Sequence, residues 1–266
     1  MTDKYSKRGE EKMLASERLI HIRKRLEEKK ILNLKDITLE LETSESTVRR
    51  DFEELEKQGV LKRVHGGVIK AKMESILSDT MELTMDEKAI LNMETKKKIC
   101  YEASKLVKDG NCVFVDGGTS LMYMLDYLCD KNVKIVTHSV LNVHNILNSK
   151  AEIIVIGGKY IPNYKMNVGP ISIETMEKFN FDYSFIGCTG IDLSERTVFT
   201  ADMETAAIKQ IAIKNALSSY LLIDSSKLDV RGFYKFSDLN SFDAVFTDEY
   251  PDDAEKIENV VVCKNN

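Results

Sequence analysis

The sequence predicts an α/β protein of two domains: a winged helix-turn-helix at the N-terminal end, and a parallel sheet covered by helices in the remainder. Three observations predict this. Apolar residues recur at helical spacing before residue 60, short apolar strands alternate with helical stretches after residue 93, and the net charge differs in sign between the two parts. We place the domains at residues 1–68 and 93–266, with a linker over residues 69–92.

The composition is that of a globular protein. The chain has 266 residues, of which 43% are hydrophobic and 30% charged, so there is room for more than one core. No run approaches the roughly 20 consecutive apolar residues that a membrane-spanning helix needs. Residues 1–11 are charged almost throughout and lack the apolar centre of a secretory signal. We therefore expect a cytoplasmic protein with no membrane partner.

Cysteine and histidine show no spacing typical of a disulfide framework or a metal site. There is no C-x-x-C pair, and no histidine lies near a cysteine in a ligand-like pattern. The cysteines are Cys100, Cys112, Cys129, Cys188 and Cys263. We expect free, buried thiols, no metal and no cofactor.

Charge is distributed unevenly along the chain. Residues 1–72 hold 18 Lys and Arg against 14 Asp and Glu, a net charge of +4, and the remainder therefore carries −9 of the total of −5. The first segment is suited to a polyanion and the second would repel one.

Three short helices are expected in the first domain. Apolar residues at helical spacing predict a helix over residues 16–30, and a second, shorter helix has its inner face at Leu34, Ile37 and Leu41. Ser44 is suited to the N-cap of a third helix, because its hydroxyl can accept a hydrogen bond from an amide of the first turn.

The third helix has an apolar stripe and a polar outer face. Val48, Phe52 and Leu55 share the stripe, because successive helical residues turn by about 100°. Gly59 ends the helix, since glycine readily adopts the left-handed conformation that follows a helix. The polar face near the helix start carries Ser46, Thr47, Arg49 and Arg50. Three such helices form a helix-turn-helix, whose third helix enters the major groove of DNA.

A wing is expected after the third helix. Residues 60–64 can form a strand, and glycines at positions 66 and 67 give it a flexible tip. From there Lys62, Arg63 and His65 are placed to contact phosphates beside the groove. The predicted DNA-binding residues are Ser44, Ser46, Thr47, Arg49, Arg50, Lys62, Arg63 and His65.

This segment closely resembles the signature of the DeoR family of bacterial transcription regulators. In that family an S-x-x-T-[IV]-R-R-D-L helix is followed by a G-x-[IL]-x-R-x-H-G-G wing. The matching residues are 44–52, 55–56, 59–61 and 63–67. Phe52 stands where leucine is usual, which is a conservative departure. The resemblance implies that double-stranded operator DNA is the partner of the first domain.

The sequence pattern of the second domain predicts a Rossmann-like parallel sheet. After a polar linker with room for one helix, helices are expected over residues 94–108, 121–128 and 203–217. Strands are expected over residues 111–116, 133–137, 153–156, 183–186, 220–223, 244–246 and 260–262. Alternating helices and strands imply a parallel sheet with both faces covered. Residues 193–201 are expected to form a mobile loop.

One strand end carries a candidate phosphate cradle. The residues are Asp116, Gly117, Gly118, Thr119 and Ser120, directly after one strand and before one helix. Glycines let backbone amides approach a ligand, hydroxyls donate hydrogen bonds, and a helix N-terminus favours negative charge. A glycine-rich turn is equally well a plain tight connection, so both interpretations stay open. The motif is neither a Walker A loop nor G-x-G-x-x-G, so nucleotide binding is not favoured.

Polar residues or glycines also follow four other strands. They are Thr137-His138-Ser139, Gly157-Gly158-Lys159, residues 187–190 and residues 224–227. If these loops converge, Lys227 can pair with a phosphate, and Asp116 and Asp224 can accept hydrogen bonds from sugar hydroxyls. A structural histidine at position 138 and a tight turn at Gly157-Gly158 are the alternatives. Glu204 and Lys209 are weaker candidates, because exposed helix charges usually only contact solvent.

Residues 98–248 are similar to the effector domain of the same DeoR family, which resembles ribose-5-phosphate isomerase and glucosamine-6-phosphate deaminase in fold. The family patterns D-x-G-T-[TS], T-N-S, G-G, D-x-x-F-x-G and D-x-S-K match at residues 116–120, 137–139, 157–158, 182–187 and 224–227. The resemblance implies that a sugar phosphate binds at these loops and alters operator affinity. The predicted effector-binding residues are Asp116, Gly117, Gly118, Thr119, Ser120, His138, Ser139, Gly157, Gly158 and Lys227. His138 replaces the usual asparagine and changes the donors and acceptors on offer.

The sequence therefore predicts a DNA-binding transcriptional regulator, a repressor of a carbohydrate-metabolism operon controlled by a phosphorylated sugar. One module buries too little surface for a specific site, so we expect a homodimer or homotetramer. The alternative is a sugar-phosphate isomerase or deaminase fused to a DNA-binding head, with Asp116, Asp224 or His138 as base. We expect no catalytic residue, because the sequence places no second acid or base. A scaffold with a vestigial pocket is a third hypothesis.

Overall fold

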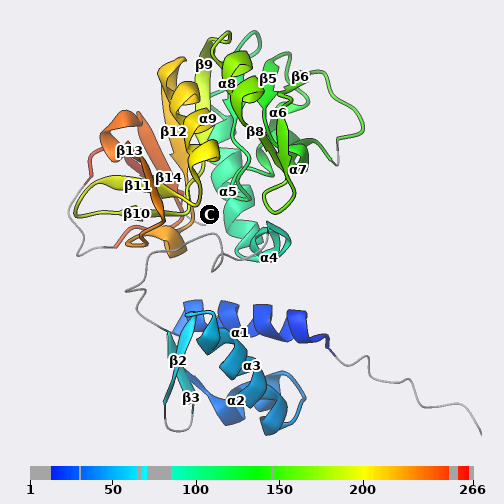
Figure 1. Ribbon diagram of the computed structural model, residues 1–266, viewed down its shortest axis with the longest axis vertical. Helices are drawn as coiled ribbons and strands as arrows, with labels where there is room; N and C mark the ends of the chain where they lie inside the picture. The colour runs from blue at the N-terminus through cyan, green and yellow to red at the C-terminus, as the bar shows by residue number, and fades with distance from the viewer. Residues whose placement is uncertain are drawn as a thin grey trace, which may run out of the picture. The chain divides into compact units, whose positions relative to one another are not determined.

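The computed structural model describes residues 13–29, 31–64, 67–70, 85–144, 146–251 and 257–263. The chain divides into two compact units, residues 1–72 and residues 73–266, and each is described by itself (Figure 1). Across the described ranges, no helix is both long enough and apolar enough to cross a membrane.

The first unit contains the three helices that the sequence predicts and a small antiparallel sheet. The helices are α1 (Ala15–Lys29), α2 (Leu34–Glu40) and α3 (Glu45–Lys57). The strands are β1 (Ile31–Asn33), β2 (Leu61–Val64) and β3 (Gly67–Lys70), in the order β1-β3-β2. β2 and β3 form the predicted wing. β1 was not predicted, because three residues are too few to show an alternating pattern.

Local sequence signals define the ends of α3. Ser44 is the N-cap, and its Oγ accepts a hydrogen bond from the Thr47 amide at 3.2 Å. Gln58 is the C-cap, and the following Gly59 has a φ of 70°, the left-handed conformation expected of it. The inward stripe is buried as predicted, together with residues of α1, α2 and the sheet. The fully or nearly buried apolar residues include Ile22, Leu26, Ile37, Val48, Phe52, Leu55 and Leu61.

A seven-stranded parallel sheet forms the second unit, which confirms the predicted α/β class. Its strand order is β15-β14-β12-β9-β4-β5-β6. The strands are β4 (Cys112–Val115), β5 (Lys134–Thr137), β6 (Glu152–Val155), β9 (Phe181–Ile186), β12 (Ala216–Leu222), β14 (Ala244–Thr247) and β15 (Val260–Val262). After β4, the strands β5 and β6 are added on one side of it. After β9, the strands β12, β14 and β15 are added on the other side. The pair β4 and β9 is therefore the topological switch point, beside which ligands bind in such sheets.

Helices cover both faces of this sheet. They are α4 (Met85–Ile90), α5 (Met93–Ser104), α6 (Met124–Leu128), α7 (Val140–Val143), α8 (Pro170–Met176) and α9 (Met203–Lys214). Val113 and Val115 of β4 pack in one apolar cluster with Ile99 of α5, whereas Phe114 packs in another with Ile208 of α9. The alternation along a strand thus places apolar side chains on both faces.

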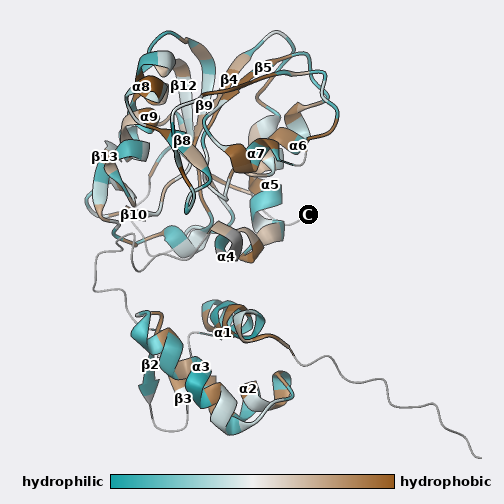
Figure 2. Ribbon diagram, turned by 45° about the vertical axis from the view of Figure 1, so that its right-hand side comes forward, coloured by the Kyte–Doolittle hydropathy of each residue, from teal (hydrophilic) through white to brown (hydrophobic). Residues whose placement is uncertain are grey.

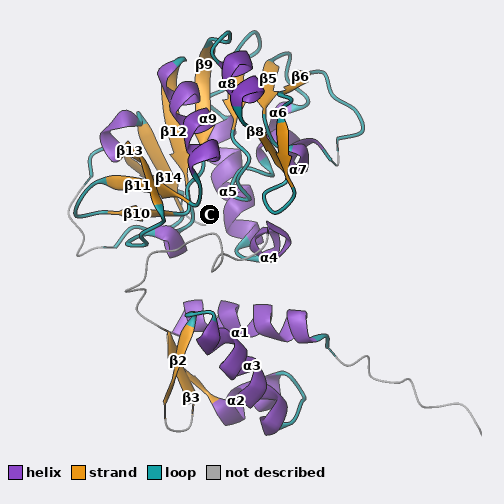
Figure 3. Ribbon diagram, viewed as in Figure 1, coloured by secondary structure: helices purple, strands orange, loops and turns teal. Residues whose placement is uncertain are grey.

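Two antiparallel elements accompany the sheet and were not predicted (Figure 3). β7 (Lys159–Ile161) pairs with β8 (Met166–Val168). β10 (Gly190–Asp192), β11 (Thr197–Thr200) and β13 (Tyr234–Asp238) form a three-stranded sheet.

The predicted mobile loop over residues 193–201 is therefore wrong. It contains the β10–β11 turn and β11 itself, with Val198 and Phe199 buried. The helix predicted to residue 217 ends at Lys214, because the chain enters β12 at Ala216.

Gly158 supports one stability prediction. Its φ is +149°, and a Cβ there would lie 2.6 Å from the Val168 carbonyl oxygen and would also overlap Ser172 Oγ. We expect Gly158→Ala to lower the free energy of unfolding by about 1–3 kcal/mol, as strained or overpacked positions do. Urea unfolding of the full chain measures this. Gly157→Ala is the control, because a Cβ at Gly157 meets nothing within 4 Å; equal losses in both variants would refute the steric argument.

Candidate functional site

The outer face of α3 is polar and open to solvent. Ser46, Arg49 and Arg50 are exposed, and Thr47 is half-buried, while the opposite stripe packs inward. In Figure 2 the helix accordingly shows hydrophilic and hydrophobic segments along its length. The predicted groove-facing residues therefore lie together on one surface.

Arg49 is held only loosely. Its Nη2 lies 3.3 Å from Glu45 Oε2, and the two side chains are 64% and 48% exposed. An exposed pair of this kind contributes little to stability. The guanidinium is therefore free to exchange this partner for a base edge or a phosphate. Ser44, by contrast, is occupied by its capping bond and by contacts of 2.8 Å with the hydroxyls of Ser46 and Thr47.

A salt bridge that the sequence analysis missed anchors α3 to α1. Arg18 Nε donates to Asp51 Oδ2 at 2.8 Å, and Nη2 donates to Oδ1 at 3.0 Å. Asp51 is buried, and hydrogen bonding to it raises the pKa of Arg18. The bidentate geometry fixes the orientation of α3, and hence of Arg49 and Arg50, against α1. The available signal was an acidic residue directly beside the apolar stripe.

The wing is tied to α3 through Arg63. Its amide donates to Glu56 Oε1 at 2.8 Å, its Nε donates to Glu56 Oε2 at 2.5 Å, and its Nη1 donates to Glu53 Oε1 at 2.8 Å. A phosphate contact by Arg63 would have to replace some of these bonds. Lys62 is exposed. His65, which was predicted to contact DNA, lies outside the described residues.

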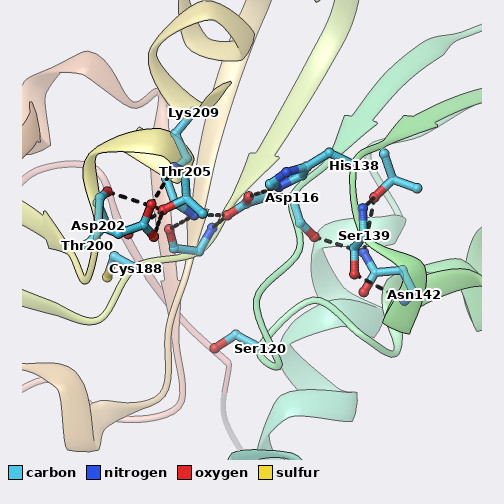
Figure 4. A network of polar contacts seen from close by, with 12 residues as sticks. Asp116, Ser120, His138, Ser139, Asn142, Cys188, Thr200, Asp202, Thr205 and Lys209 are labelled. Carbon is cyan, nitrogen blue, oxygen red and sulfur yellow. Dashed lines mark hydrogen bonds and ion pairs between the residues drawn. The ribbon is translucent and has the colours of Figure 1, made fainter. Parts of the chain in front are cut away.

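In the second unit, Asp116 lies at the switch point and is fully buried. Its Oδ1 is 3.0 Å from His138 Nε2, and its Oδ2 accepts a hydrogen bond from the Gly187 amide at 2.9 Å and pairs with Lys209 Nζ (Figure 4). Burial raises the pKa of Asp116, but Lys209 and His138 outweigh it and hold that pKa well below its usual range. The carboxylate thus joins the end of β4 to the end of β9 and to α9.

Lys209 is not the exposed helix charge that the sequence suggested. It is 4% exposed, and its Nζ also donates to the Gly187 carbonyl at 3.0 Å. The prediction of an exposed Lys209 is therefore wrong, because α9 turns this face toward the sheet. Glu204 does lie at the surface, where it pairs with Lys159 at 2.8 Å.

The loop after β5 points inward. His138 is fully buried, and its Nδ1 lies 3.0 Å from the Asn167 carbonyl oxygen. Ser139 is also buried and caps α7, since its Oγ accepts a hydrogen bond from the Asn142 amide at 3.3 Å. Asn142 Nδ2 in turn donates to the Asp116 carbonyl at 2.8 Å. These residues support the glycine loop from behind.

A cleft opens in front of the same loop. Its walls include Gly118, Thr119, Gly187, Thr205, Lys209 and Lys227. Three predicted effector-binding residues, Gly118, Thr119 and Lys227, are among them. A Cβ at Gly118 would come no closer than 4.0 Å to Gly187 Cα, so this glycine faces open space.

Two lysines flank the glycine loop. Lys227 Nζ donates to Ser120 Oγ at 2.8 Å and to the Cys188 carbonyl at 3.0 Å. Lys96 Nζ is buried and lies 3.4 Å from Thr119 Oγ1. Burial, and then the charge of Lys227, lowers the pKa of Lys96 to about 8. The loop is therefore set between two cationic groups.

Asp224 supplies the nearby negative charge. It is buried, and its Oδ1 accepts hydrogen bonds from Asn92 Nδ2 at 3.0 Å and from Ser226 Oγ. Burial raises the pKa of Asp224. Several neighbouring groups, of which Lys227 has the largest effect, outweigh burial and keep that pKa below its usual value. Lys96 was not among the predicted site residues; its signal is a lysine three residues before Ile99 on the apolar face of its helix.

Both halves of the chain match family models. Residues 18–74 match the DeoR-like helix-turn-helix domain, and residues 91–249 match the DeoR C-terminal sensor domain. The chain belongs to the DeoR family. This confirms the resemblance that the two sets of sequence motifs indicate.

Similar proteins include named regulators. The chain is 33% identical to the uncharacterized HTH-type transcriptional regulator FruR of Bacillus subtilis, over 89% of this chain and 92% of that protein. It is 31% identical to the lactose phosphotransferase system repressor of Streptococcus mutans, over 91% and 95% of the two chains. Among solved structures, ribose 5-phosphate isomerase A from Methanocaldococcus jannaschii matches with 18% identity and a TM-score of 0.39, over 52% and 55% of the two chains.

Not every predicted effector residue of this DeoR-family protein lines the cleft. Gly157 and Gly158 are exposed and are not among the lining residues. The Gly157 carbonyl accepts a hydrogen bond from Ser172 Oγ at 2.8 Å, and Gly158 approaches the backbone of β8 closely. Their geometry is that of the tight turn between β6 and β7. A Cβ at Gly117 would lie 2.6 Å from the Met166 side chain, so this glycine permits close packing.

No metal site is found in the described part of the chain, since no three His, Cys, Asp or Glu side chains come together there as ligands.

Proposed function

We propose that this DeoR-family protein represses a carbohydrate-metabolism operon and that a phosphorylated sugar, bound in the sensor domain, controls its affinity for operator DNA. The observation that carries the proposal is the glycine loop of residues 117–120 at the switch point of the sheet, flanked by Lys96 and Lys227 and facing a cleft. Backbone amides and two ammonium groups suit a phosphate. A relative named as a lactose phosphotransferase system repressor supports the carbohydrate assignment.

DNA contact is assigned to the open face of α3 and to the wing. Arg49 and Arg50 are the proposed readers of base edges and phosphates, Ser46 and Thr47 contact the backbone or bases, and Lys62 contacts a phosphate. For Ser44 and Arg63 we propose structural roles. Ser44 caps α3, and Arg63 holds the wing against α3.

The oligomeric state and the cellular location that we propose follow from the proposed function. A single winged module covers too little DNA for a rare operator, so we propose a homodimer or homotetramer that reads half-sites about one helical turn, or a multiple of it, apart. Transcriptional control places the protein in the cytoplasm. We retain residues 1–68 as the DNA-binding domain, 69–92 as the linker and 93–266 as the sensor domain.

An enzymatic role is not proposed. A general base must reach a substrate proton directly or through one water. Both carboxylate oxygens of Asp116 are already bonded, both ring nitrogens of His138 face protein oxygens, and Asp224 is buried against Asn92 and Ser226. These contacts occupy the three candidate bases.

A gel-shift titration tests the proposed function. The full chain is incubated with the DNA upstream of its own gene, and a panel of hexose and pentose phosphates is added at fixed salt, since salt alone changes such affinities. We expect a specific shifted band that at least one sugar phosphate abolishes, whereas the unphosphorylated sugar does not. A band insensitive to every sugar phosphate would count against the effector assignment.

Lys227 is the most direct test of the phosphate contact. We expect Lys227→Met to retain operator binding but to need roughly tenfold to hundredfold more effector for release, because a hydrogen bond to a charged group contributes about 1.5–3 kcal/mol. The same gel-shift titration measures it. Lys134→Met is the control, because Lys134 is 62% exposed at the amino end of β5, at the opposite edge of the sheet from the glycine loop, and pairs only with Glu152 in the described structure. An unchanged response in Lys227→Met would remove this lysine from the site.

A further inference from the structure

His138 is enclosed by groups that accept hydrogen bonds and cannot donate them. Its Nδ1 lies 3.0 Å from the main-chain oxygen of Asn167. A carbonyl oxygen carries no proton, so this nitrogen must be the donor. The ring is fully buried, with Phe114 stacked on it at a centroid distance of 6.0 Å, so water offers no alternative partner.

The second ring nitrogen also needs a proton. Nε2 lies 3.0 Å from Asp116 Oδ1. Lys209 Nζ and the Gly187 amide both donate to the other oxygen of this carboxylate, so Asp116 is charged and its Oδ1 is an acceptor. Without a proton between them, two lone pairs would face each other in a buried site, which is strongly unfavourable.

We propose that His138 is a buried imidazolium, and that Lys209, Asp116 and His138 form a cluster with a surplus positive charge that favours an anion in the adjoining cleft. Two cations here face one carboxylate. The anion in question is the phosphate group of the proposed effector, so this second part rests on the proposed function. The charge state of His138 does not.

This cluster adjoins the cleft directly. Lys209 and Gly187 both line the cleft, and a Cβ built on Gly187 would lie 3.6 Å from Asp116 Oδ2 and 3.9 Å from Gly118 Cα. The surplus charge of the cluster therefore lies beside the cleft, where it attracts a bound anion. The charged groups that face His138 are Asp116, from the end of β4, and Lys209 behind it, from α9, while β8 presents only the Asn167 carbonyl.

The arrangement makes anion binding depend on proton binding. An anion in the cleft stabilises the protonated cluster, and by linkage the protonated cluster binds the anion more tightly. Removal of that proton would abolish the surplus charge and lower the affinity for an anion. The asparagine that the resemblance leads one to expect at this position cannot titrate. His138 is therefore a positioning residue whose proton is linked to anion binding.

The charge state can be measured without any ligand. Substituting His21, His65 and His144 by glutamine leaves His138 as the single histidine among the four of the chain. Its ring nitrogens are then observed by ¹⁵N NMR of the full chain at pH 7.5, where an ordinary exposed histidine is mostly neutral. We expect both nitrogens to show the shifts of protonated imidazolium. One protonated and one bare nitrogen would overturn the proposal.

The linkage is tested with sulfate, whose charge is constant over the pH range used. Calorimetry at pH 6.5 and pH 9.0 compares the full chain with His138→Asn. Lys96, with a pKa of about 8, titrates in both proteins, so their difference isolates His138. We expect the unsubstituted chain to lose on the order of tenfold more sulfate affinity than the variant, the effect of one nearby charge.

Equal losses in the two proteins would refute the linkage. Absence of sulfate binding by the unsubstituted chain at pH 6.5 would refute the anion cleft, and with it the effector part of the proposed function, whereas the NMR result would still decide the charge of His138. If His138→Asn does not fold, His138→Gln replaces it in the comparison. Thermal unfolding of each variant, measured first, shows which one retains the fold.

Discussion

Replacing Arg49 and Arg50 together by alanine is expected to lower operator affinity by at least about thirtyfold, since each well-placed arginine contact is worth roughly 1–3 kcal/mol. Both guanidiniums are exposed on α3, and neither supports the core of the first unit. Stability and effector binding should therefore change little. Fluorescence anisotropy with the operator at fixed salt measures the loss.

A charge-matched control separates recognition from general attraction. Lys24→Ala combined with Lys29→Ala removes two positive charges from exposed positions on α1. Removal of general attraction alone weakens binding to all DNA sequences by a similar factor, whereas loss of a base contact relaxes preference for the operator. If both double variants lose affinity equally and keep their sequence preference, α3 is not the reading helix.

Asp116→Asn is expected to be the most damaging single change in the second unit. It removes the negative charge between Lys209 and His138, both of which are buried. Breaking a buried ion pair by removing one partner costs about 3–5 kcal/mol of unfolding free energy. Urea unfolding at pH 7 measures this loss directly.

Glu204→Gln provides the matched comparison, because it breaks another lysine–carboxylate pair of the same unit at the surface. Glu204 is 40% exposed and its partner Lys159 is 64% exposed, so the expected cost is about 0–1 kcal/mol. A similar small effect of Asp116→Asn would show that the buried cluster does not stabilise the fold.

The pH dependence gives a second measure of Asp116. Its folded pKa lies below the value of about 3.9 for an unfolded aspartate, so its contribution is present at neutral pH and is lost as pH falls through the acid range. Asp116→Asn should therefore flatten the acid side of the stability profile. If the variant loses unfolding free energy at low pH in the same way as the unsubstituted chain, the stabilising role of the Asp116 carboxylate is contradicted.

The first unit was largely predictable because its signals are local. The spacing of Val48, Phe52 and Leu55 specifies the buried stripe of α3, and Ser44 and Gly59 mark its ends. The bond between Arg18 and Asp51 was not predictable, because it joins residues 33 positions apart. Periodicity shows which face of a helix is buried but not which charged groups meet there.

The seven parallel strands were also predictable from their short apolar runs. The small sheet of β10, β11 and β13 was not, because it pairs segments across residues 190–238 that carry no regular alternation. The burial of Lys96 and Lys209 was likewise not predictable from the sequence. A lysine in a helix is normally exposed, and burial is acceptable only where tertiary contacts supply partners.

The sequence by itself determined the family, the two kinds of domain and the glycine loop after β4, because each depends on residues close together in the chain. Only the tertiary structure decided what Asp116 and His138 do. Asp116 meets His138, Gly187 and Lys209 from distances of 22, 71 and 93 positions along the chain. Which of these groups carry a proton depends on their mutual distances and on the exclusion of water, and neither is encoded in the spacing of a motif.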